Sequence, residues 1–212
     1  MLLILDMDET LITNKTLKFR ESIEQITNED AVETVFKEER IAIFQREYLK
    51  EFLQFVFNQF KYVALWSSAN KSWIKHVIDN TILSEYENKF IFIWSGEKTS
   101  ILRNTVRYPY MTRCKKLKKI WRQKKYKDLG IGKHNTIIVD DISKNFVLNY
   151  GNGILINEYK INTKDNSLLL LIEFFKKNLL NNPNFDIRKV QNKNNWFRLF
   201  DEKDKNDQGN CT

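Results

Sequence analysis

The sequence is poor in cysteine and histidine, which argues against two common kinds of stabilising or catalytic centre. Its two cysteines, Cys114 and Cys211, are far apart, so they indicate no disulfide framework and favour a reducing compartment. Its two histidines, His76 and His134, lack the spacing of zinc ligands. A cysteine-based phosphatase would need an arginine six residues after Cys114, where the chain has Ile120, so we interpret this cysteine as non-catalytic.

Long hydrophobic segments are also missing. The opening run, residues 1–5, is too short for a signal peptide, lacks its basic flank and ends at Asp6. The apolar run at residues 168–175 is interrupted by Glu173 and is far shorter than a membrane span. These absences predict a soluble intracellular protein of the cytoplasm or nucleus that has no membrane partner.

Glycine and proline are scarce too, with six and two residues, but the chain has ample material for a core. Of its 212 residues, 42% are hydrophobic and 13% aromatic, which argues against wholesale disorder and suits one domain with an insertion. The 35 Lys and Arg residues exceed the 27 Asp and Glu residues, which gives a formal net charge of +8. This charge favours an acidic partner, such as a nucleic acid or a phosphoprotein, although a generally lysine-rich surface explains it equally well.

Short apolar segments alternate with amphipathic segments along most of the chain. Apolar runs predict buried strands, and apolar residues at intervals of three and four predict helices. The predicted strands are residues 2–5, 62–66, 90–94, 136–141 and 153–157, with 40–44 as a further candidate, and the predicted helices are 47–60, 71–82 and 167–180. This order indicates an α/β fold: a Rossmann-like parallel sheet of about five strands with helices on both faces. Residues 14–40 are polar and charged and are expected to form an irregular or excursion segment, and Trp66, Trp73 and Trp94 are expected in the core.

Acidic and hydroxyl side chains follow three of the predicted strands where each strand ends. Asp6 and Asp8 follow the first strand, Ser67 follows the second, and Asp140 and Asp141 close the fourth. The carboxyl ends of parallel strands meet at one edge of a sheet, where ligands bind. Clustered carboxylates repel one another unless a cation lies among them, and oxygen ligands of this kind favour Mg²⁺. The sequence therefore predicts a magnesium site at this edge.

These residue types suit metal-assisted phosphoryl transfer. Acids at alternate positions can both address one bound group, so Asp6 can be the nucleophile that forms an aspartyl phosphate. Asp8 can then protonate the leaving oxygen and afterwards activate water. Thr10 and Ser67 would donate hydrogen bonds to the substrate, and a lysine would neutralise the transferring phosphoryl oxygens.

The segment LDMDETLI (5–12) resembles the DxDx[TV] first motif of the haloacid dehalogenase superfamily. Its D-x-D-E-T-L form is similar to the branch of RNA polymerase II C-terminal-domain (CTD) phosphatases and NLI-interacting-factor-like phosphatases. Three further segments extend the resemblance over most of residues 1–180: REYLKEFLQFV (46–56), VALWSSAN (63–70) and TIIVDDIS (136–143). The first of these departs from the family, whose usual Arg-Pro-Gly is Arg46-Glu47-Tyr48 here.

The resemblance implies how the chain is divided. A phosphatase domain is expected over residues 1–180, with a basic insertion at about 95–135 between the second and third motifs. A polar, flexible tail is expected over residues 181–212. Within it, the apolar cluster at 195–200 is expected to form a last helix or to dock a partner.

The resemblance also implies the ligand set. Asp6, Asp141 and the backbone carbonyl of Asp8 would bind Mg²⁺ directly, and Asp140 would support the site through water or hydrogen bonds. By the same analogy, Ser67 takes the role of the second-motif hydroxyl.

The lysine of the third motif has two candidates. KYKDLGIG (125–132) contains Lys127 in the Lys-Asp-Leu form common in small CTD phosphatases, and CKKLKKIW (114–121) offers Lys115. In the family this lysine begins a helix that packs on the sheet. An apolar helical face follows Lys115, whereas two glycines follow Lys127, so the pattern favours Lys115 and leaves Lys127 as the alternative.

Residues 103–133 form the most basic part of the chain. They contain twelve Lys or Arg residues and one acid, Asp128. The stretch could be a groove wall for a phosphoserine-rich peptide or a nucleic-acid backbone, or only the solvated face of a helix and loops.

The favoured function is a Mg²⁺-dependent phosphatase that acts on phosphoserine or phosphothreonine of a protein, such as an RNA polymerase II CTD-like tail. A polynucleotide 3′-phosphatase is the second hypothesis, because the superfamily contains such enzymes and residues 103–133 are basic. The third hypothesis is a catalytically inactive binding scaffold.

Overall fold

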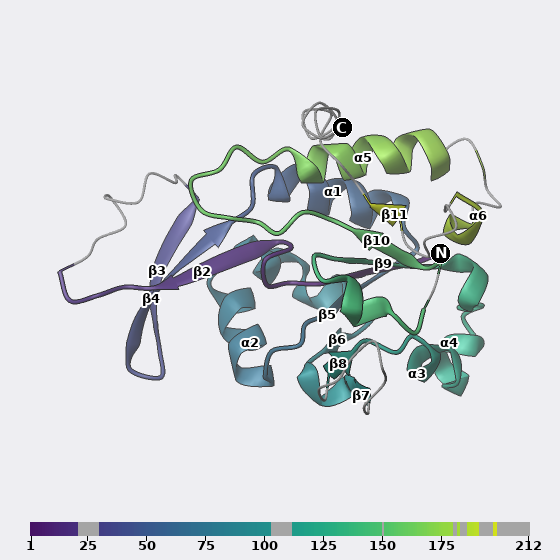
Figure 1. The fold of residues 1–212 in the computed structure, drawn as a ribbon, viewed down its shortest axis with the longest axis horizontal. Coiled ribbons are helices and arrows are strands. Elements are labelled where there is room, and N and C mark those ends of the chain that lie inside the picture. The colour runs from purple at the N-terminus through teal and green to yellow at the C-terminus, as the bar shows by residue number, and fades with distance from the viewer. Residues whose placement is uncertain are drawn as a thin grey trace, which may run out of the picture.

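The computed structural model describes residues 1–20, 30–102, 112–149, 151–179, 182, 186–190 and 197–198. Its centre is a sheet of six parallel strands in the order β11-β10-β9-β1-β5-β6 (Figure 1). These strands are β1 (Leu2–Leu5), β5 (Tyr62–Trp66), β6 (Ile93–Trp94), β9 (Thr136–Asp140), β10 (Gly153–Leu155) and β11 (Phe197–Arg198). The predicted α/β fold is confirmed, and five of the six strands fall within predicted ones.

The position of β1 in the sheet determines where the functional residues meet. This strand lies between β5 and β9, and its register places Leu5 beside Leu65 and Val139. All four residues of β1 are fully buried, as expected for a central parallel strand covered on both faces. Because β1, β5 and β9 run in the same direction and end at one edge, the residues that follow them converge.

Side chains of the central strands alternate between two apolar layers. Odd-numbered residues of β1 pack against α1 (Leu49–Gln59), α2 (Lys71–Asp79) and α5 (Ser167–Leu179). Even-numbered residues of β1 pack against α3 (Lys118–Trp121) and α4 (Lys124–Lys127) on the opposite face. The sheet is therefore covered on both sides, as predicted (Figure 1). The second predicted helix is shorter than expected, because it ends at Asp79 and is followed by the 3₁₀ helix η2 (Ile82–Lys89).

A second sheet occupies the segment that was predicted to be irregular or an excursion. Its three antiparallel strands, in the order β2-β4-β3, are β2 (Ile12–Thr16), β4 (Glu39–Gln45) and β3 (Ala31–Phe36), and it projects from the body of the protein (Figure 1). The candidate strand at 40–44 belongs to β4. The segment 14–40 was expected to be irregular or an excursion; the described part is an excursion with regular strands, which were not predicted because β2 and β3 are short and lack an apolar run. The β3–β4 turn uses Lys37 and Glu38 at positive φ, without the glycine that would have signalled a hairpin.

A short antiparallel hairpin lies within the predicted insertion, between β6 and α3. It consists of β7 (Ser100–Leu102) and β8 (Thr112–Cys114), which follow the 3₁₀ helix η3 (Gly96–Lys98). Residues 103–111, which carry part of the predicted basic surface, lie outside the described residues.

Three short helices complete the described part: η4 (Lys133–Asn135), η5 (Ser143–Phe146) and α6 (Ile187–Val190). The helix expected at 195–200 is wrong for Phe197–Arg198, which form β11 and pair with β10. Most of the predicted tail, 181–212, lies outside the described residues. Among the helices that the structure describes, none combines the length and apolar character that a membrane crossing requires.

Candidate active site

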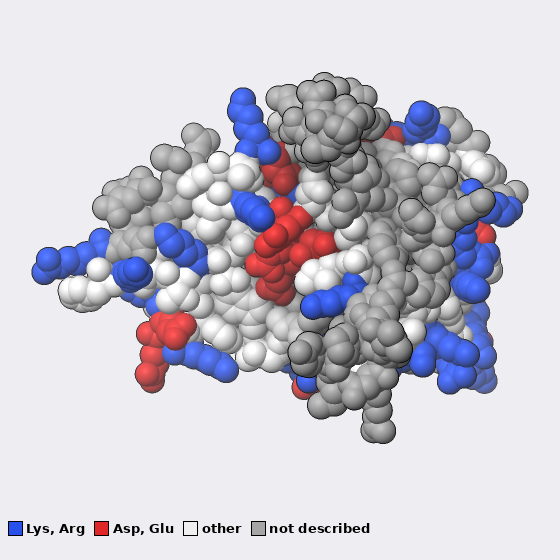
Figure 2. All heavy atoms as spheres, viewed as in Figure 1, with Lys and Arg blue, Asp and Glu red and all other residues white. Residues whose placement is uncertain are grey.

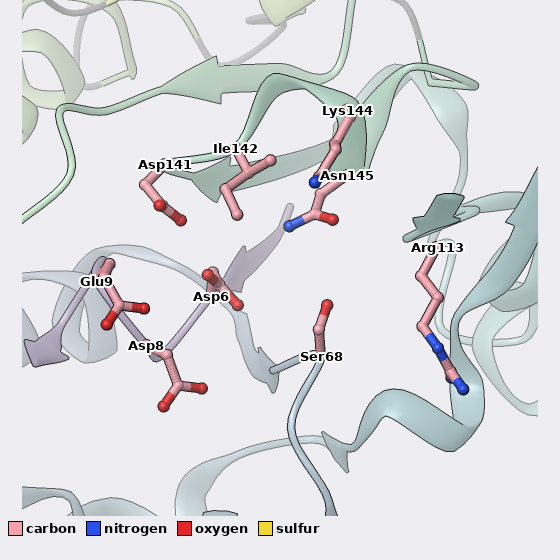
Figure 3. Close-up of a pocket in the computed structure, with 9 residues that line it drawn as sticks. All are labelled: Asp6, Asp8, Glu9, Ser68, Arg113, Asp141, Ile142, Lys144 and Asn145. Carbon is pink, nitrogen blue, oxygen red and sulfur yellow. The ribbon is translucent and has the colours of Figure 1, made fainter. Parts of the chain in front are cut away.

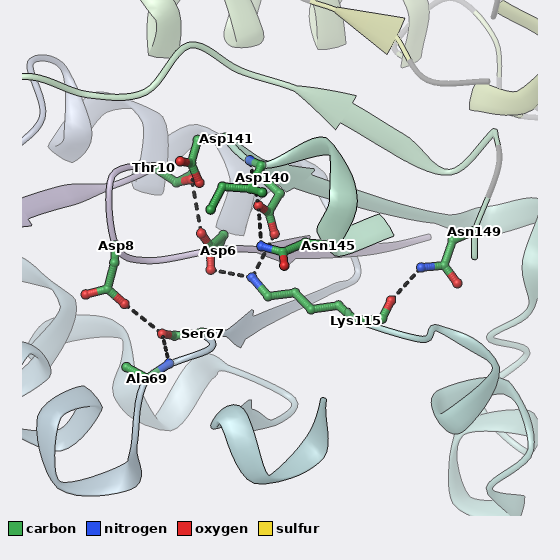
Figure 4. Close-up of polar contacts among 11 residues, drawn as sticks. Asp6, Asp8, Thr10, Ser67, Ala69, Lys115, Asp140, Asp141, Asn145 and Asn149 are labelled. Atoms are coloured by element: carbon green, nitrogen blue, oxygen red, sulfur yellow. Dashed lines mark hydrogen bonds and ion pairs between the residues drawn. The ribbon is translucent and has the colours of Figure 1, made fainter. Parts of the chain in front are cut away.

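Three carboxylates meet where β1 and β9 end. Asp6 follows β1, its backbone N–H donating to the carbonyl of Val139 at 3.0 Å, while Asp140 is the last residue of β9 and Asp141 the next. One carboxylate oxygen from each of these three aspartates lies within 4.8 Å of the other two. The convergence that strand order predicted for Asp6, Asp140 and Asp141 is therefore present in the structure (Figure 4).

Lys115 enters this cluster from the end of β8. Its side chain is fully buried, and its Nζ donates to Asp140 Oδ2 at 2.8 Å and also to Asp6 Oδ1. Its backbone is held from both sides, because its N–H donates to the carbonyl of Asn145 and its carbonyl accepts from Asn149 Nδ2. Lys127, the other candidate for the third motif, is exposed on α4.

Thr10 joins two of the carboxylates. It is fully buried in a tight turn, and its Oγ1 lies 3.3 Å from both Asp6 Oδ2 and Asp141 Oδ1. Three successive backbone N–H groups of this turn, those of residues 10–12, donate to the carbonyl of Met7. A single hydroxyl proton can serve only one carboxylate at a time. In this structure Thr10 therefore contacts the acid cluster, where the sequence led us to expect a donor to the substrate.

Asp8 points away from the cluster toward β5 and α2. Its Oδ2 accepts from Ser67 Oγ at 2.7 Å, and its Oδ1 accepts from the indole Nε1 of Trp73, also at 2.7 Å. Ser67 is fully buried and in turn accepts from the backbone N–H of Ala69 at 2.9 Å (Figure 4). Both oxygens of Asp8 are thus held by donors from a single segment, residues 67–73.

Asp140 is fully buried and already saturated with donors. Its Oδ1 accepts from the backbone N–H of Ile142 at 2.9 Å and from Asn145 Nδ2 at 2.8 Å, while Oδ2 accepts from Lys115. Asp141 is only half-buried and faces open space. Of the two adjacent acids, Asp141 is therefore the one with accessible oxygens.

A cavity of about 340 Å³ opens onto this arrangement. It is lined by Asp6, Asp8, Glu9, Ser68, Arg113, Asp141, Ile142, Lys144 and Asn145. The acids lie on one side, and the side chains of Arg113 and Lys144 lie on the other (Figure 3). On the molecular surface, acidic side chains gather in the middle of this face, with lysine and arginine around them (Figure 2).

The cluster carries more negative charge than its lysine can balance. Burial, and then the charge of Asp140, raises the pKa of Asp6 well above its ordinary value, and Lys115 offsets this only in part. The same two causes raise the pKa of Asp141 to about 6. Burial lowers the pKa of Lys115, but the charges of Asp140 and Asp6 outweigh burial and leave that pKa above its usual value. Lys115 therefore stays protonated and pairs with two of the three carboxylates, those of Asp6 and Asp140.

Glu9 adds to the acidic side of the cavity. Burial, followed by the charges of Asp8 and Asp141, raises the pKa of Glu9 to about 7. Its backbone has a φ of 55°, a left-handed conformation that costs an ordinary residue about 1 kcal/mol or more. This conformation turns the chain after Asp8 so that Thr10 comes back beneath Asp6.

Comparison with known proteins assigns the chain to a family. The family model described as NLI interacting factor-like phosphatase matches residues 1–188. The chain belongs to this family. The resemblance to the CTD-phosphatase branch that the motifs indicated is thereby confirmed.

Individual curated proteins are similar to part or most of the chain. Human ubiquitin-like domain-containing CTD phosphatase 1 is 29% identical over 180 residues, which are 83% of this chain and 49% of that protein. A putative CTD phosphatase-like protein of Invertebrate iridescent virus 3 is 36% identical over 84 residues, which are 38% of this chain and 44% of that protein. The chain thus spans about half the length of the curated relatives it matches first.

Solved structures share the fold. Fcp1, an essential RNA polymerase II CTD phosphatase, has a TM-score of 0.59 at 12% identity, with 89% of this chain and 68% of that chain covered. Fission yeast Fcp1 bound to beryllium fluoride has a TM-score of 0.51 at 14% identity, with 89% and 60% covered. These likenesses establish the haloacid dehalogenase-like fold and nothing finer.

Several residues around the site were not found from the sequence. Trp66 and Trp94 are core residues as predicted, but Trp73 is half-buried and binds Asp8. Ser68, and not the predicted Ser67, lines the cavity. The remaining unpredicted lining residues are Glu9, Arg113, Ile142, Lys144 and Asn145. A single sequence gives no signal for them, because each reaches the cavity from a turn, a short 3₁₀ helix or a short strand and belongs to no periodic pattern.

Proposed function

We propose that this chain is a Mg²⁺-dependent phosphatase that removes phosphate from phosphoserine or phosphothreonine of a protein through an aspartyl phosphate on Asp6. One observation carries the proposal: three carboxylates converge at an open cavity, and two of them pair with one buried ammonium group. When all three carboxylates are ionised, their three negative charges and the one positive charge of Lys115 leave the cluster two charges short of neutrality. A divalent cation would balance this charge.

The donor set suits magnesium. All the candidate ligands are oxygens, and Mg²⁺ prefers oxygen ligands at about 2.0–2.1 Å. Two oxygens on opposite sides of such an ion lie about 4.2 Å apart, so atoms within 4.8 Å of one another could share an ion after small side-chain movements. Asp6, Asp141 and the backbone carbonyl of Asp8 would hold the ion, which would neutralise charge on the phosphoryl oxygens. Asp140, which accepts hydrogen bonds from Lys115, Ile142 and Asn145, would orient Lys115.

The chain's own residues would carry the two chemical steps. In the first, a carboxylate oxygen of Asp6 attacks phosphorus, the ester P–O bond breaks, and Asp8 gives its proton to the leaving serine or threonine oxygen. In the second, Asp8 takes a proton from water, the water oxygen attacks phosphorus, and phosphate leaves as Asp6 is regenerated. Lys115 would hold Asp6 in place and stabilise negative charge on the phosphoryl group.

The substrate class rests on the relatives and on the shape of the cavity. Several relatives are named CTD phosphatases, which points to a phosphoprotein. The cavity is open, and cationic side chains of Arg113 and Lys144 stand opposite the acids, where they could hold the anionic phosphopeptide during docking (Figure 3).

Hydrolysis of p-nitrophenyl phosphate tests the reaction class. Wild-type protein should turn the substrate over with Mg²⁺ and lose activity in EDTA, and Asp6→Asn should be inactive while keeping its fold by circular dichroism. Asp128→Asn makes the same chemical change at an exposed site and should retain full activity. A folded wild-type protein that is inert with Mg²⁺ would favour the binding scaffold.

A second assay separates the substrate classes. A phosphoserine peptide and a 3′-phosphorylated oligonucleotide are compared at equal concentration with Mg²⁺ present. The proposal predicts that kcat/KM is higher for the peptide. Turnover of the oligonucleotide alone would replace it with a polynucleotide 3′-phosphatase.

A further inference from the structure

One side chain outside the predicted site contacts the proposed acid–base residue directly. The indole N–H of Trp73 donates to Asp8 Oδ1 at 2.7 Å, at the short end of the usual range for N–H···O bonds. A hydrogen bond to a carboxylate is roughly twice as strong as one between neutral groups. Trp73 is only half-buried, so core packing alone does not account for where its polar edge points.

Hydrogen bonds to the neighbouring backbone fix the position of Trp73 in the first turn of α2. Asn70 caps α2, and its side chain accepts from the backbone N–H of Trp73 at 2.8 Å. Just before the cap, Ser67 accepts from the backbone N–H of Ala69 and donates to Asp8 Oδ2. The end of β5 and the first turn of α2 therefore form one compact unit that donates hydrogen bonds to both oxygens of Asp8.

Neighbouring rings fix where the indole points. Phe36 packs edge-on against Trp73 with ring centroids 5.2 Å apart, and His76 stacks on it at 5.9 Å. Phe36 also contacts His76 at 5.0 Å, so the three rings form one cluster. Phe36 is the last residue of β3, at the tip of the small antiparallel sheet. This sheet thus braces the indole that binds Asp8.

We propose that Trp73 is a positioning residue that, together with Ser67, aims the carboxyl group of Asp8 at the leaving-group oxygen, and that the tip of the β3–β4 hairpin holds it in that role. The inference rests on the phosphatase function proposed above. Asp8 has two oxygens and one flexible side chain, and it must sit within hydrogen-bond reach of the departing oxygen to protonate it. Two donors on opposite oxygens restrict its rotation more than Ser67 alone would.

The test uses substrates that differ in their need for a proton. The alkoxide of a phosphoserine peptide leaves readily only when it is protonated, whereas p-nitrophenolate leaves without help. The value of kcat/KM reports the step that forms the aspartyl phosphate. Trp73→Phe should lower kcat/KM for the peptide by about 10- to 100-fold, within the range of acid–base contributions, and that for p-nitrophenyl phosphate by less than about 3-fold. Equal losses for both substrates, or no loss for either, would overturn the inference.

Two controls separate positioning from general damage. Trp121→Phe makes the same chemical change at a half-buried indole that donates to Thr136 Oγ1 at 3.1 Å in the opposite layer, and it should leave both substrates unaffected. In an Asp8→Asn background, Trp73→Phe should cause no further loss for the peptide, because its effect acts through Asp8. A further loss in that background would show a separate role for Trp73 and contradict the proposal.

A measurement without turnover keeps this inference distinct from the proposed function. In ¹⁵N-labelled protein, which has five tryptophans, Asp8→Asn should shift one indole N–H resonance strongly, whereas Asp128→Asn should shift none. If the wild type proves inert but the resonance shifts, the phosphatase proposal fails and the contact stands. If the enzyme is active and no indole resonance responds to Asp8→Asn, the Trp73 inference fails on its own.

Discussion

Replacing Arg46 with methionine should lower the free energy of unfolding by about 3 to 5 kcal/mol, the cost of breaking a buried ion pair from one side. The Arg46 side chain is fully buried between the two sheets and α5. Its Nη1 donates to the carbonyl of Thr10 at 2.8 Å, and its Nη2 donates to the carbonyl of Asn157 at 2.7 Å and to Asp165 Oδ2 at 2.6 Å. The methionine chain fills similar volume but satisfies none of these acceptors.

The expected loss of unfolding free energy follows from the polar groups that Arg46→Met would leave without a donor. Asp165 would keep a nearly buried charge that, within the described part of the chain, is left with the backbone N–H of Ser167 at the start of α5 as its donor. The buried carbonyl of Thr10 would lose its partner, which costs about 1–3 kcal/mol, and the carbonyl of Asn157, an exposed residue, would lose its partner at a smaller cost because water can replace the donor. These costs overlap with that of the stranded charge, so about 3 to 5 kcal/mol is a fair total. Because one carbonyl belongs to Thr10, turnover should fall as well.

Urea unfolding followed by circular dichroism measures the effect. Arg40→Met is the matched control, since Arg40 pairs with Glu33 on the surface with both side chains more than a third exposed, and it should cost less than about 1 kcal/mol. Adding Asp165→Asn to Arg46→Met should recover part of the loss by removing the stranded charge. If Arg46→Met costs no more than Arg40→Met, the ion pair does not brace the fold and this reasoning is refuted.

Three further changes probe the site. Lys115→Met should lower the free energy of unfolding, measured by urea titration in EDTA, by about 3 kcal/mol or more. Lys127→Met, at an exposed site, should change it by less than about 0.5 kcal/mol. Equal effects would favour Lys127 as the lysine of the third motif. The pKa of Asp141 is about 6 in the folded chain and 3.8 as a free side chain. Between these two pH values the folded chain binds more protons than the unfolded chain, so the stability of the metal-free protein falls as pH rises from 3.8 to about 6. Mg²⁺ displaces that proton, so the rise in Tm on adding Mg²⁺ should be larger at about pH 7.5 than at about pH 5, and a rise independent of pH would contradict this. Gly96→Ala would place a Cβ 2.3 Å from the carbonyl oxygen of Ser68. It should lower the free energy of unfolding in urea by about 1–3 kcal/mol and disturb the cavity wall. A variant as stable as the wild type would show that the backbone at Ser68 moves aside without cost.

The central sheet could be predicted from the sequence because its strands are continuous apolar runs. Residues 2–5, 62–66 and 136–140 are buried on both faces, so each reads as a strand without help from its neighbours. The acids that follow these runs come together because parallel strands share an edge, and the structure brings Asp6, Asp140 and Asp141 within reach of one another. That part of the site is a consequence of topology.

The rest of the site depends on turns and on tertiary packing. The small sheet was missed because β3 has no buried residue and its turn has no glycine. Trp73 was placed in the core because an aromatic residue on an amphipathic helix usually packs there, and nothing local reveals that its N–H meets Asp8. Residues that reach the cavity from very short elements, such as Lys144 in η5, leave no periodic trace in a single chain.

The contrast between Asp6 and Asp8 shows why spacing alone did not fix their roles. Alternation places two acids separated by one residue on the same face of a strand, but β1 ends at Leu5, and the turn that follows it redirects the second acid. Asp6 accepts a hydrogen bond from Lys115, which lies on the α3 side of the sheet. Asp8 accepts one from Trp73, which lies on the α2 side. The proposed nucleophile, Asp6, and the proposed acid–base group, Asp8, are therefore supported by opposite sides of the sheet. Under this proposal, a change in α2 can alter proton transfer without touching Asp6, and a change around Lys115 can alter Asp6 without moving Asp8.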